Sequence, residues 1–218
     1  MTKFLNATEY LFGKHGYEGT TIRAIAAKAH VNLGTLKHYW GSKRELFRAL
    51  FERRFRPMQE EHMRRLRELE HKVSDGSRPE VLQVLRTLIE PTFFVGETRH
   101  AASRDDMQSA QTRKRFHMLL GRALMDPSPA VIAEMTRLGD EPMRLFLSLM
   151  QRACPELTLA ELDWRVNCVL GAQVFSQLYT KRVGRFYGGE ADVDDALACD
   201  WTLHCLMNGF NARPSAIQ

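Results

Sequence analysis

The chain has 218 residues, of which 44% are hydrophobic and 26% charged, an ordinary composition for a globular protein with a buried core. No stretch matches the roughly 18 consecutive apolar residues of a membrane span, and the first residues lack the pattern of an export signal. We therefore expect a cytoplasmic protein whose four cysteines, none in a CxxC pair, are buried and reduced.

The positive charge is concentrated near the N-terminus. Residues 1–56 contain 11 Lys and Arg against 4 Asp and Glu, a balance of +7. Residues 57–218 contain 20 against 22, a balance of −2. A small basic module on a nearly neutral body is typical of a phosphate-binding head, although a merely solvated surface can have the same composition.

Helical periodicity dominates the chain and predicts an all-α fold of about nine helices. The first is expected from about Lys3 to Lys14, closed by Gly16 as a C′ residue. Gly19-Thr20-Thr21 offers an N-cap for a short amphipathic helix over 22–29. After a break at His30-Val31-Asn32, a second short helix is expected over 33–40.

A long helix is expected from Lys43 onwards, with Ser42 as its N-cap. Pro57 should kink or end it, because proline removes a backbone donor. The charged stretch 59–72 is interpreted as a solvated helical linker, followed by a loop at 74–79. Later helices should be bounded by breaks at 100–103, 126–129, 139–142, 154–155 and 187–189, and the last two, roughly 159–185 and 193–208, are largely apolar.

Residues 22–41 fit a helix-turn-helix, in which two short helices cross through small or apolar residues. The apolar positions are Ile25, Ala26 and Ala29 at the crossing, Val31 in the turn, and Leu36 and Tyr39 on the inner face of the second helix. His30 would occupy the left-handed turn position usually given to glycine. The outer face would carry groups suited to base edges and phosphates, namely Asn32, Leu33, Thr35, Lys37 and His38. The alternative is an ordinary helical hairpin with a polar outer face.

The same region carries a longer pattern. It comprises FLNAT-x-x-LF over 4–12, GY at 16–17, TT at 20–21, IA-x-x-A-x-V over 25–31, GTL-x-x-YW over 34–40, Lys43 and Leu46. This pattern resembles the DNA-binding domain of the TetR repressor family. The resemblance implies a helix-turn-helix DNA-binding domain over residues 1–50 and a helical ligand-binding and dimerisation domain over 51–218.

The resemblance also implies roles for single residues. Thr21 and Arg23 would contact backbone or bases, Gly34 and Thr35 would lie against the groove, and Lys43 would hold a phosphate. The expected DNA-binding set is Thr21, Arg23, Asn32, Leu33, Gly34, Thr35, Lys37, His38 and Lys43. Three features depart from the family: Lys37 replaces a usual tyrosine, His30 replaces the turn glycine, and a basic N-terminal arm is nearly absent.

Homodimerisation through the last two helices is a further implication, and it predicts a pseudo-palindromic operator. The sequence favours it independently through apolar residues at helical spacing: Leu162, Val166, Val169, Leu170, Val174, Leu178, Trp201, Leu203, Cys205, Leu206 and Phe210. Gly171, Ala172 and Ser176 would allow close approach. A core within one protomer could use the same residues.

An effector site is expected among the middle helices. Its candidates are Phe93, Phe94, His117, Leu120, Arg122, Phe146, Met150, Trp164 and Phe175, with plain core packing as the alternative for each. The segment 116–130 resembles the branch of the family that senses fatty-acid or acyl-thioester ligands. Arg122 could then meet an acidic head group, or it could pair with Asp126.

The sequence gives little sign of a catalytic or metal site. It contains no HExxH motif, no clustered metal ligands, no phosphate-binding glycine pattern and no nucleophile beside a base. We expect no cofactor, no metal and no enzyme. The sequence favours a sequence-specific DNA-binding transcriptional regulator, a repressor released from its operator by a small hydrophobic ligand. The alternatives are a helical small-molecule carrier or enzyme with an incidental helix-turn-helix, and an architectural DNA-binding protein.

Overall fold

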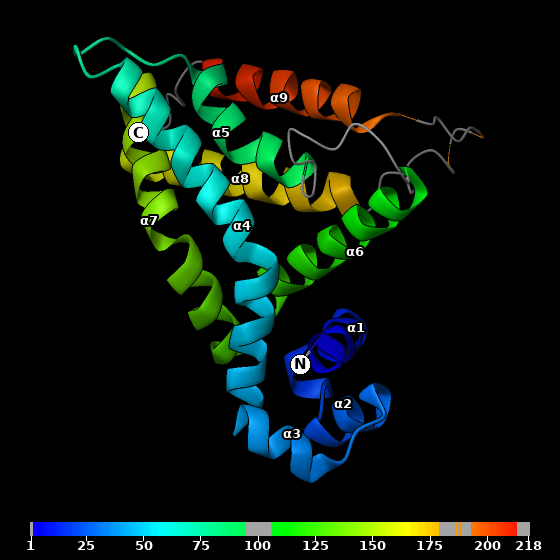
Figure 1. The fold of residues 1–218 in the computed structure, drawn as a ribbon. Coiled ribbons are helices and arrows are strands. Elements are labelled where there is room, and N and C mark those ends of the chain that lie inside the picture. The colour runs from blue at the N-terminus through cyan, green and yellow to red at the C-terminus, as the bar shows by residue number, and fades with distance from the viewer. Residues whose placement is uncertain (1, 95–105, 179–185, 187, 189–192, 213–218) are drawn as a thin grey trace. The chain divides into compact units, whose positions relative to one another are not determined.

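The computed structural model describes residues 2–94, 106–178, 186, 188 and 193–212, without the side chains of residues 36, 37, 106–112, 177 and 178. Over these ranges the chain forms nine helices and no strand, which confirms the predicted all-α fold (Figure 1). They are α1 (Thr2–Gly19), α2 (Ile22–Ala29), α3 (Leu33–Trp40), α4 (Lys43–Lys72), α5 (Val81–Phe93), α6 (Asp106–Met125), α7 (Pro129–Ala153), α8 (Leu159–Leu178) and α9 (Asp195–Asn211). None of the described helices has both the length and the apolar character that crossing a bilayer requires.

The helices form two compact units. The first unit comprises residues 1–59 and 115–140, and the second comprises residues 60–114 and 141–218. Three helices, α4, α6 and α7, therefore contribute one end to each unit. The functional division at residue 50 that the resemblance implies stays a prediction.

The helix-turn-helix forms as the local sequence predicts. Ile25, Ala26 and Ala29 are buried where α2 meets its neighbours. His30 is left-handed, with φ 55° and ψ 47°, and its N–H donates to the carbonyl of Ala27 at 3.1 Å. The N–H of Val31 donates to the carbonyl of Ala26 at 3.0 Å, so α2 ends in a Schellman motif built without glycine.

The end of α3 differs from expectation. Tyr39 was expected as an inner anchor, but its side chain is 55% exposed, and its ring is tilted against that of Phe4 with 6.4 Å between centroids. Trp40, the last residue of α3, is half-buried instead. In the last turn of this short helix, Trp40 and not Tyr39 is therefore the more buried side chain.

A row of aromatic rings forms the core of the first unit. On α4, Phe47, Phe51 and Phe55 recur every four residues and therefore share one face. Phe12 of α1 packs on this row, at 5.2 Å from Phe47, and Phe116 of α6 lies 5.8 Å from Phe55. Tilted and edge-on aromatic pairs of this kind contribute about 0.5–1.5 kcal/mol each beyond their burial. The row packs α1 and the end of α6 against α4.

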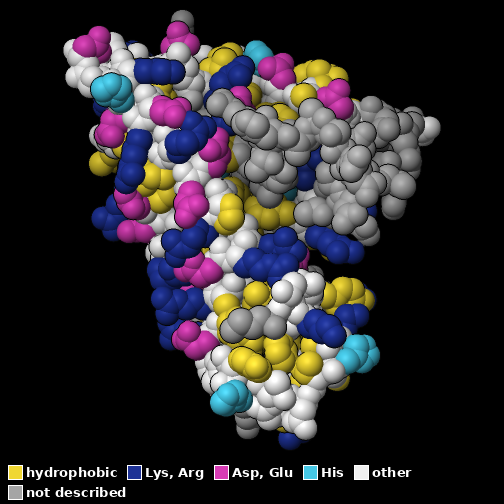
Figure 2. Space-filling view, viewed as in Figure 1, with side chains coloured by type: hydrophobic (Ala, Val, Ile, Leu, Met, Phe, Trp, Pro, Cys, Tyr) yellow, Lys and Arg dark blue, Asp and Glu magenta, His cyan; other side chains and the backbone are white. Residues whose placement is uncertain are grey.

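One expectation about α4 is wrong. Of the two outcomes expected at Pro57, a kink or an end, the helix does not end there but continues to Lys72. The stretch 59–72, however, is not the expected solvated linker, because His62, Leu66 and Leu69 are buried. These three recur at helical spacing inside a charged run, so one face enters the core while the others carry ion pairs. Figure 2 shows basic and acidic side chains interspersed along the side of the molecule where α4 runs.

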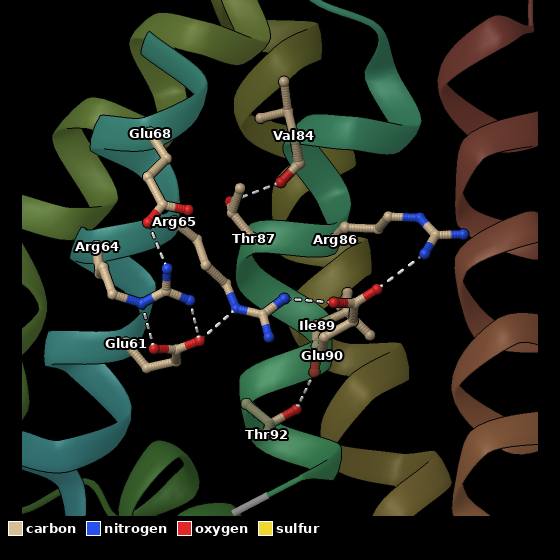
Figure 3. Close-up of polar contacts among 10 residues, drawn as sticks. All are labelled: Glu61, Arg64, Arg65, Glu68, Val84, Arg86, Thr87, Ile89, Glu90 and Thr92. Atoms are coloured by element: carbon tan, nitrogen blue, oxygen red, sulfur yellow. Dashed lines mark hydrogen bonds and ion pairs between the residues drawn. The ribbon is translucent and has the colours of Figure 1, made fainter. Parts of the chain in front are cut away.

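An ion-pair network joins α4 to α5 in the second unit (Figure 3). The guanidinium of Arg65 lies between Glu61 of its own helix and Glu90 of α5. Glu61 also pairs with Arg64, and Arg86 of α5 reaches Glu90 at 3.0 Å. Hydrogen bonds from Arg64, and less strongly from Arg65, outweigh burial and hold the pKa of Glu61 at about 2.

Helix ends in the second unit are closed by arginines from elsewhere in the chain, one from the loop before α5 and one from α7. The guanidinium of Arg78 donates to the carbonyl of Ala153, the last residue of α7, at 2.6 and 2.9 Å. Arg152 of α7 in turn donates to the carbonyl of Val73, just past the end of α4, at 2.7 Å. Carbonyls at helix ends have no partner within the helix, and these contacts satisfy them.

The remaining breaks are partly confirmed. α6 ends before 126–129 and α7 before 154–155, as predicted. The break expected at 139–142 is wrong, since α7 runs through it with Pro142 buried inside the helix. The break at 100–103 and residues 179–185 lie outside the described residues, and 187–189 lie there except for Gly188. All four cysteines are free, but only Cys154 and Cys199 are buried, so the burial expected for Cys168 and Cys205 is wrong.

Candidate DNA-binding and ligand-binding sites

Side-chain caps set the starts of α2 and α3. The hydroxyl of Thr21 accepts from the N–H of Ala24 at 3.1 Å. The side-chain oxygen of Asn32 accepts from the N–H of Gly34 at 2.7 Å. Each of these oxygens accepts one capping bond, so the O–H donor of Thr21 and the amide N–H donors of Asn32 remain available to DNA.

The outer face of α3 is exposed, as a DNA-reading helix requires. Gly34, Thr35 and His38 are exposed, Leu33 is half-buried, and Arg23 is exposed on α2. A Cβ at Gly34 would lie 3.2 Å from the Asn32 oxygen, so glycine suits the capped first turn. Figure 1 shows α3 at the outer edge of the first unit. Lys37 lies on this helix, but its side chain is outside the described part.

The start of α4 places a cation beside α1. Ser42 accepts from the N–H of Glu45 at 3.2 Å, which confirms the predicted cap. The Lys43 ammonium lies 4.0 Å from the centroid of the Tyr17 ring, an arrangement that favours a cation–π contact. Burial lowers the pKa of Lys43, and the charges of Glu18 and Asp126 oppose this. The Tyr17 ring thus holds Lys43 in place, and Lys43 is the residue predicted to bind a phosphate.

A second basic cluster was missed by the sequence reasoning. The Lys28 ammonium of α2 lies 4.0 Å from the centroid of the Tyr10 ring, and the Lys14 ammonium of α1 lies 4.9 Å from it. A hydrogen bond and the charge of Lys14 lower the pKa of Tyr10. The i,i+4 spacing of Tyr10 and Lys14 was visible in the sequence, but the approach of Lys28 depends on how α1 and α2 pack.

The apolar residues of α8 and α9 divide between two faces. Leu162, Val166 and Val169 of α8 are buried within the second unit, as are Leu203 and Phe210 of α9. These five residues therefore belong to a core within one protomer, which was the alternative to a dimer interface. A different set is exposed: Trp164, Cys168, Gly171, Ala172 and Phe175 on α8, and Trp201 and Cys205 on α9. Leu170, Val174, Ser176 and Leu206 are half-buried, and the side chain of Leu178 is outside the described part.

The structure separates the residues suggested for the effector site into three groups. Phe93, Phe146 and Met150 are buried in the core of the second unit, with Phe94 packed against it. His117, Leu120 and Arg122 belong to the first unit, and Arg122 lies 3.9 Å from Asp126, its alternative partner. Trp164 and Phe175 are on the exposed face of α8.

One buried polar pair in the second unit had no signal in the sequence. The amide of Gln173 on α8 donates to the hydroxyl of Thr92 on α5 at 2.5 Å. The Thr92 hydroxyl itself donates to the carbonyl of Ile89 at 2.7 Å. Both side chains are buried, and Phe93 of the apolar core follows Thr92 directly. Among the described residues no group of three or more His, Cys, Asp or Glu side chains is placed to hold a metal ion.

Comparison with known proteins accounts for both parts of the chain. Residues 4–50 match the family model of bacterial regulatory proteins of the TetR family, and residues 104–209 match that of the tetracycline repressor-like C-terminal domain. No curated protein matches the chain.

Solved structures share the fold over nearly the whole length. A TetR-like transcriptional regulator from Rhodococcus sp. RHA1 is 23% identical, with a TM-score of 0.55 over 97% of this chain and 96% of that one. The fatty acid degradation regulator FadR from Bacillus halodurans is 13% identical, with a TM-score of 0.54 over 97% and 96%. FadR from Bacillus subtilis, solved in complex with stearoyl-CoA, is 12% identical, with a TM-score of 0.52 over 95% and 98%. With its helix-turn-helix, its helical C-terminal part and both family models matched, the chain belongs to the TetR family of DNA-binding transcriptional regulators.

Proposed function

We propose that the chain is a homodimeric repressor that a small hydrophobic effector releases from a pseudo-palindromic operator, and that it acts by binding and not by catalysis. The observation that carries the DNA-binding part is the exposed outer face of α3, with Thr35 and His38 projecting from it. Residues 1–50, called the head below, would contact DNA through the nine residues predicted from the sequence, and residues 51–218 would bind effector and partner.

Dimerisation is supported by the exposed face of α8. Trp164 is 72% exposed and Phe175 is 50% exposed. Between them the small residues Gly171 and Ala172 are also exposed, so a second helix could approach closely there. Large aromatic side chains around small residues on one helix face are typical of a surface that is covered by a partner. We therefore assign the dimer contact to this face, together with Trp201 of α9.

The effector is proposed to be an acyl chain with a polar head, such as an acyl thioester. FadR from Bacillus subtilis, a structural neighbour, was solved in complex with stearoyl-CoA. The core of the second unit offers Phe93, Phe146 and Met150 for the apolar chain. The buried pair Thr92 and Gln173 places polar groups beside this core, and a polar group of the effector would replace the hydrogen bond between them.

DNA binding is tested by footprinting the chain on the DNA upstream of its own gene and measuring affinity by fluorescence anisotropy. Two protected half-sites about one helical turn apart are expected. Thr35→Val should weaken binding by about tenfold, as loss of one base or phosphate contact does. Equal affinity for the footprinted site and for random DNA would contradict the proposal.

Effector binding is tested by adding stearoyl-CoA to the DNA complex, with free coenzyme A as the control. Stearoyl-CoA should release the DNA, whereas coenzyme A should not. Thr92→Val should weaken the response to stearoyl-CoA, because it removes a buried hydroxyl of the proposed site. The matched control is Thr202→Val in α9, whose hydroxyl donates to the carbonyl of Ala198 at 2.8 Å in the same unit. An equal response from both variants would remove Thr92 from the site.

A further inference from the structure

A hydrogen bond joins the head to the corner between α6 and α7 within the first unit. The N–H of Tyr17 donates to a carboxylate oxygen of Asp126 at 2.9 Å, across 109 positions of sequence. The N–H of Ser128, just before α7, donates to the other oxygen at 3.0 Å. Each oxygen of one buried carboxylate thus holds a backbone donor, one from the head and one from the corner.

The Tyr17 amide is available because α1 is broken immediately before it. Gly16 has φ 69° and ψ −175°, a conformation that residues with a Cβ rarely adopt. The position is also tightly enclosed, since a Cβ on Gly16 would lie 2.3 Å from a guanidinium nitrogen of Arg122 and 2.9 Å from Asp126. The backbone conformation requires glycine here, and a Cβ would in addition displace the Arg122 guanidinium from its place beside Asp126.

The surroundings keep the Asp126 carboxyl ionised. Burial alone would raise its pKa, but the hydroxyl of Ser128 and the two N–H donors outweigh burial. The guanidinium of Arg122, at 3.9 Å, acts in the same direction. The net result is a pKa below the ordinary value for aspartate, and a charged acceptor makes a stronger hydrogen bond than a neutral one.

We propose that Asp126 is a positioning residue for DNA recognition, which holds the head at one orientation against the α6–α7 corner. A dimer reads two half-sites at a set separation, so its affinity depends on how firmly each head is oriented. α6 runs from Asp106 to Met125, directly before Asp126, so this contact also connects the head to a helix whose other end belongs to the second unit. The inference rests on the proposed dimeric DNA binding but not on the identity of the effector.

The test compares Asp126→Asn with Asp194→Asn in the full-length chain. Asparagine keeps the shape but has only one acceptor oxygen, so one of the two N–H donors loses its partner. Asp194 is a matched control, because it caps α9 by accepting from the N–H of Leu197 at 2.7 Å and lies in the second unit. Asp126→Asn should lose more stability in urea unfolding than Asp194→Asn, because Asp126 is buried and Asp194 is exposed, and both variants should remain folded and dimeric.

The readout is the affinity for the footprinted operator and for copies with two base pairs inserted or deleted between the half-sites. We expect Asp126→Asn to bind the native spacing about tenfold more weakly than wild type and to discriminate less between spacings. Asp194→Asn should keep the wild-type ratio between spacings. A structural defect alone would lower the active fraction and leave that ratio unchanged, so an unchanged ratio in Asp126→Asn overturns the proposal.

A second variant approaches the contact from the head. Gly16→Ala should reproduce the weaker discrimination, and Arg122→Ala in the same chain should restore part of it by removing the nearest clashing atom. If Asp126→Asn leaves spacing discrimination unchanged while wild type binds the operator, the contact does not position the head, and a change in Gly16→Ala alone then reflects backbone strain. If wild type binds no specific DNA, the proposed function fails instead.

Discussion

The outer faces of α3 and α8 are both exposed, but they present opposite kinds of side chain. α3 carries Thr35 and His38, whose polar groups are well solvated in the free protein. α8 carries Trp164 and Phe175, whose exposure in water costs hydrophobic free energy. The first face is suited to exchanging water for the edges of bases, and the second to being covered by another apolar surface. Because of this difference, we assign the α3 face to DNA and the α8 face to a second protomer.

The largest expected effect tests the apolar face. Trp164→Glu should turn the dimer into a monomer, because it would place a charge inside the proposed contact. Operator affinity should fall about a hundredfold or more, because two linked half-site contacts become one. The measurements are molar mass by light scattering and operator affinity by anisotropy.

Met125→Glu is the control for this change. Met125 is 74% exposed, like Trp164, but lies at the end of α6 in the first unit. It should leave the dimer intact. Dissociation by both variants, or by neither, would show that the α8 face is not the contact.

A smaller effect sharpens the contrast between exposed and buried polar groups. His38 is exposed on α3, whereas His62 of α4 is buried, and burial lowers the pKa of His62 to about 4. The hydrogen bond with the Leu88 backbone opposes this shift, as does the charge of Glu61, while the charge of Arg65 adds to it.

The pH dependence follows from the direction of this shift. A depressed folded-state pKa means that His62 contributes stability above its unfolded pKa of about 6.5 and loses that contribution as the pH falls toward 4. The loss should reach about 2–3 kcal/mol by pH 4.5. Urea unfolding at pH 7 and pH 4.5 measures it. His62→Leu should remove most of this dependence while His38→Ala should not, and equal dependence in both would show that His62 does not cause it.

The smallest effect concerns Lys43, the first residue of α4, which follows α3 in the chain. Lys43→Ala should lower the slope of log affinity against log salt by about one unit if the ammonium holds a phosphate. If Lys43 only packs on the Tyr17 ring, the variant should lose stability and keep the wild-type slope. Anisotropy titrations at several salt concentrations separate these outcomes, with Lys72→Ala at the far end of α4 as the control for lost charge.

Short-range interactions made the head predictable. The left-handed turn at His30 and the caps at Thr21 and Ser42 bond to residues within five positions, so their pattern can be read directly in the sequence. The prediction of a solvated linker over 59–72 was wrong because the residues that pack there are hard to recognise in the local sequence. The buried face of α4 there is narrow, and its few apolar residues are masked by many ionic ones.

The faces of α8 were decided only by tertiary packing. Val166 and Val169 recur at helical spacing, and so do Trp164 and Phe175, so periodicity reveals two apolar stripes without indicating which one enters the core. The bond from Tyr17 to Asp126 and the pair of Thr92 with Gln173 join residues far apart in the chain. The sequence by itself determined most of the helices, the caps of α2 and α4 and the helix-turn-helix, because these depend on neighbours along the chain. Which apolar stripe is covered, and which distant polar groups meet, depends on how whole helices pack.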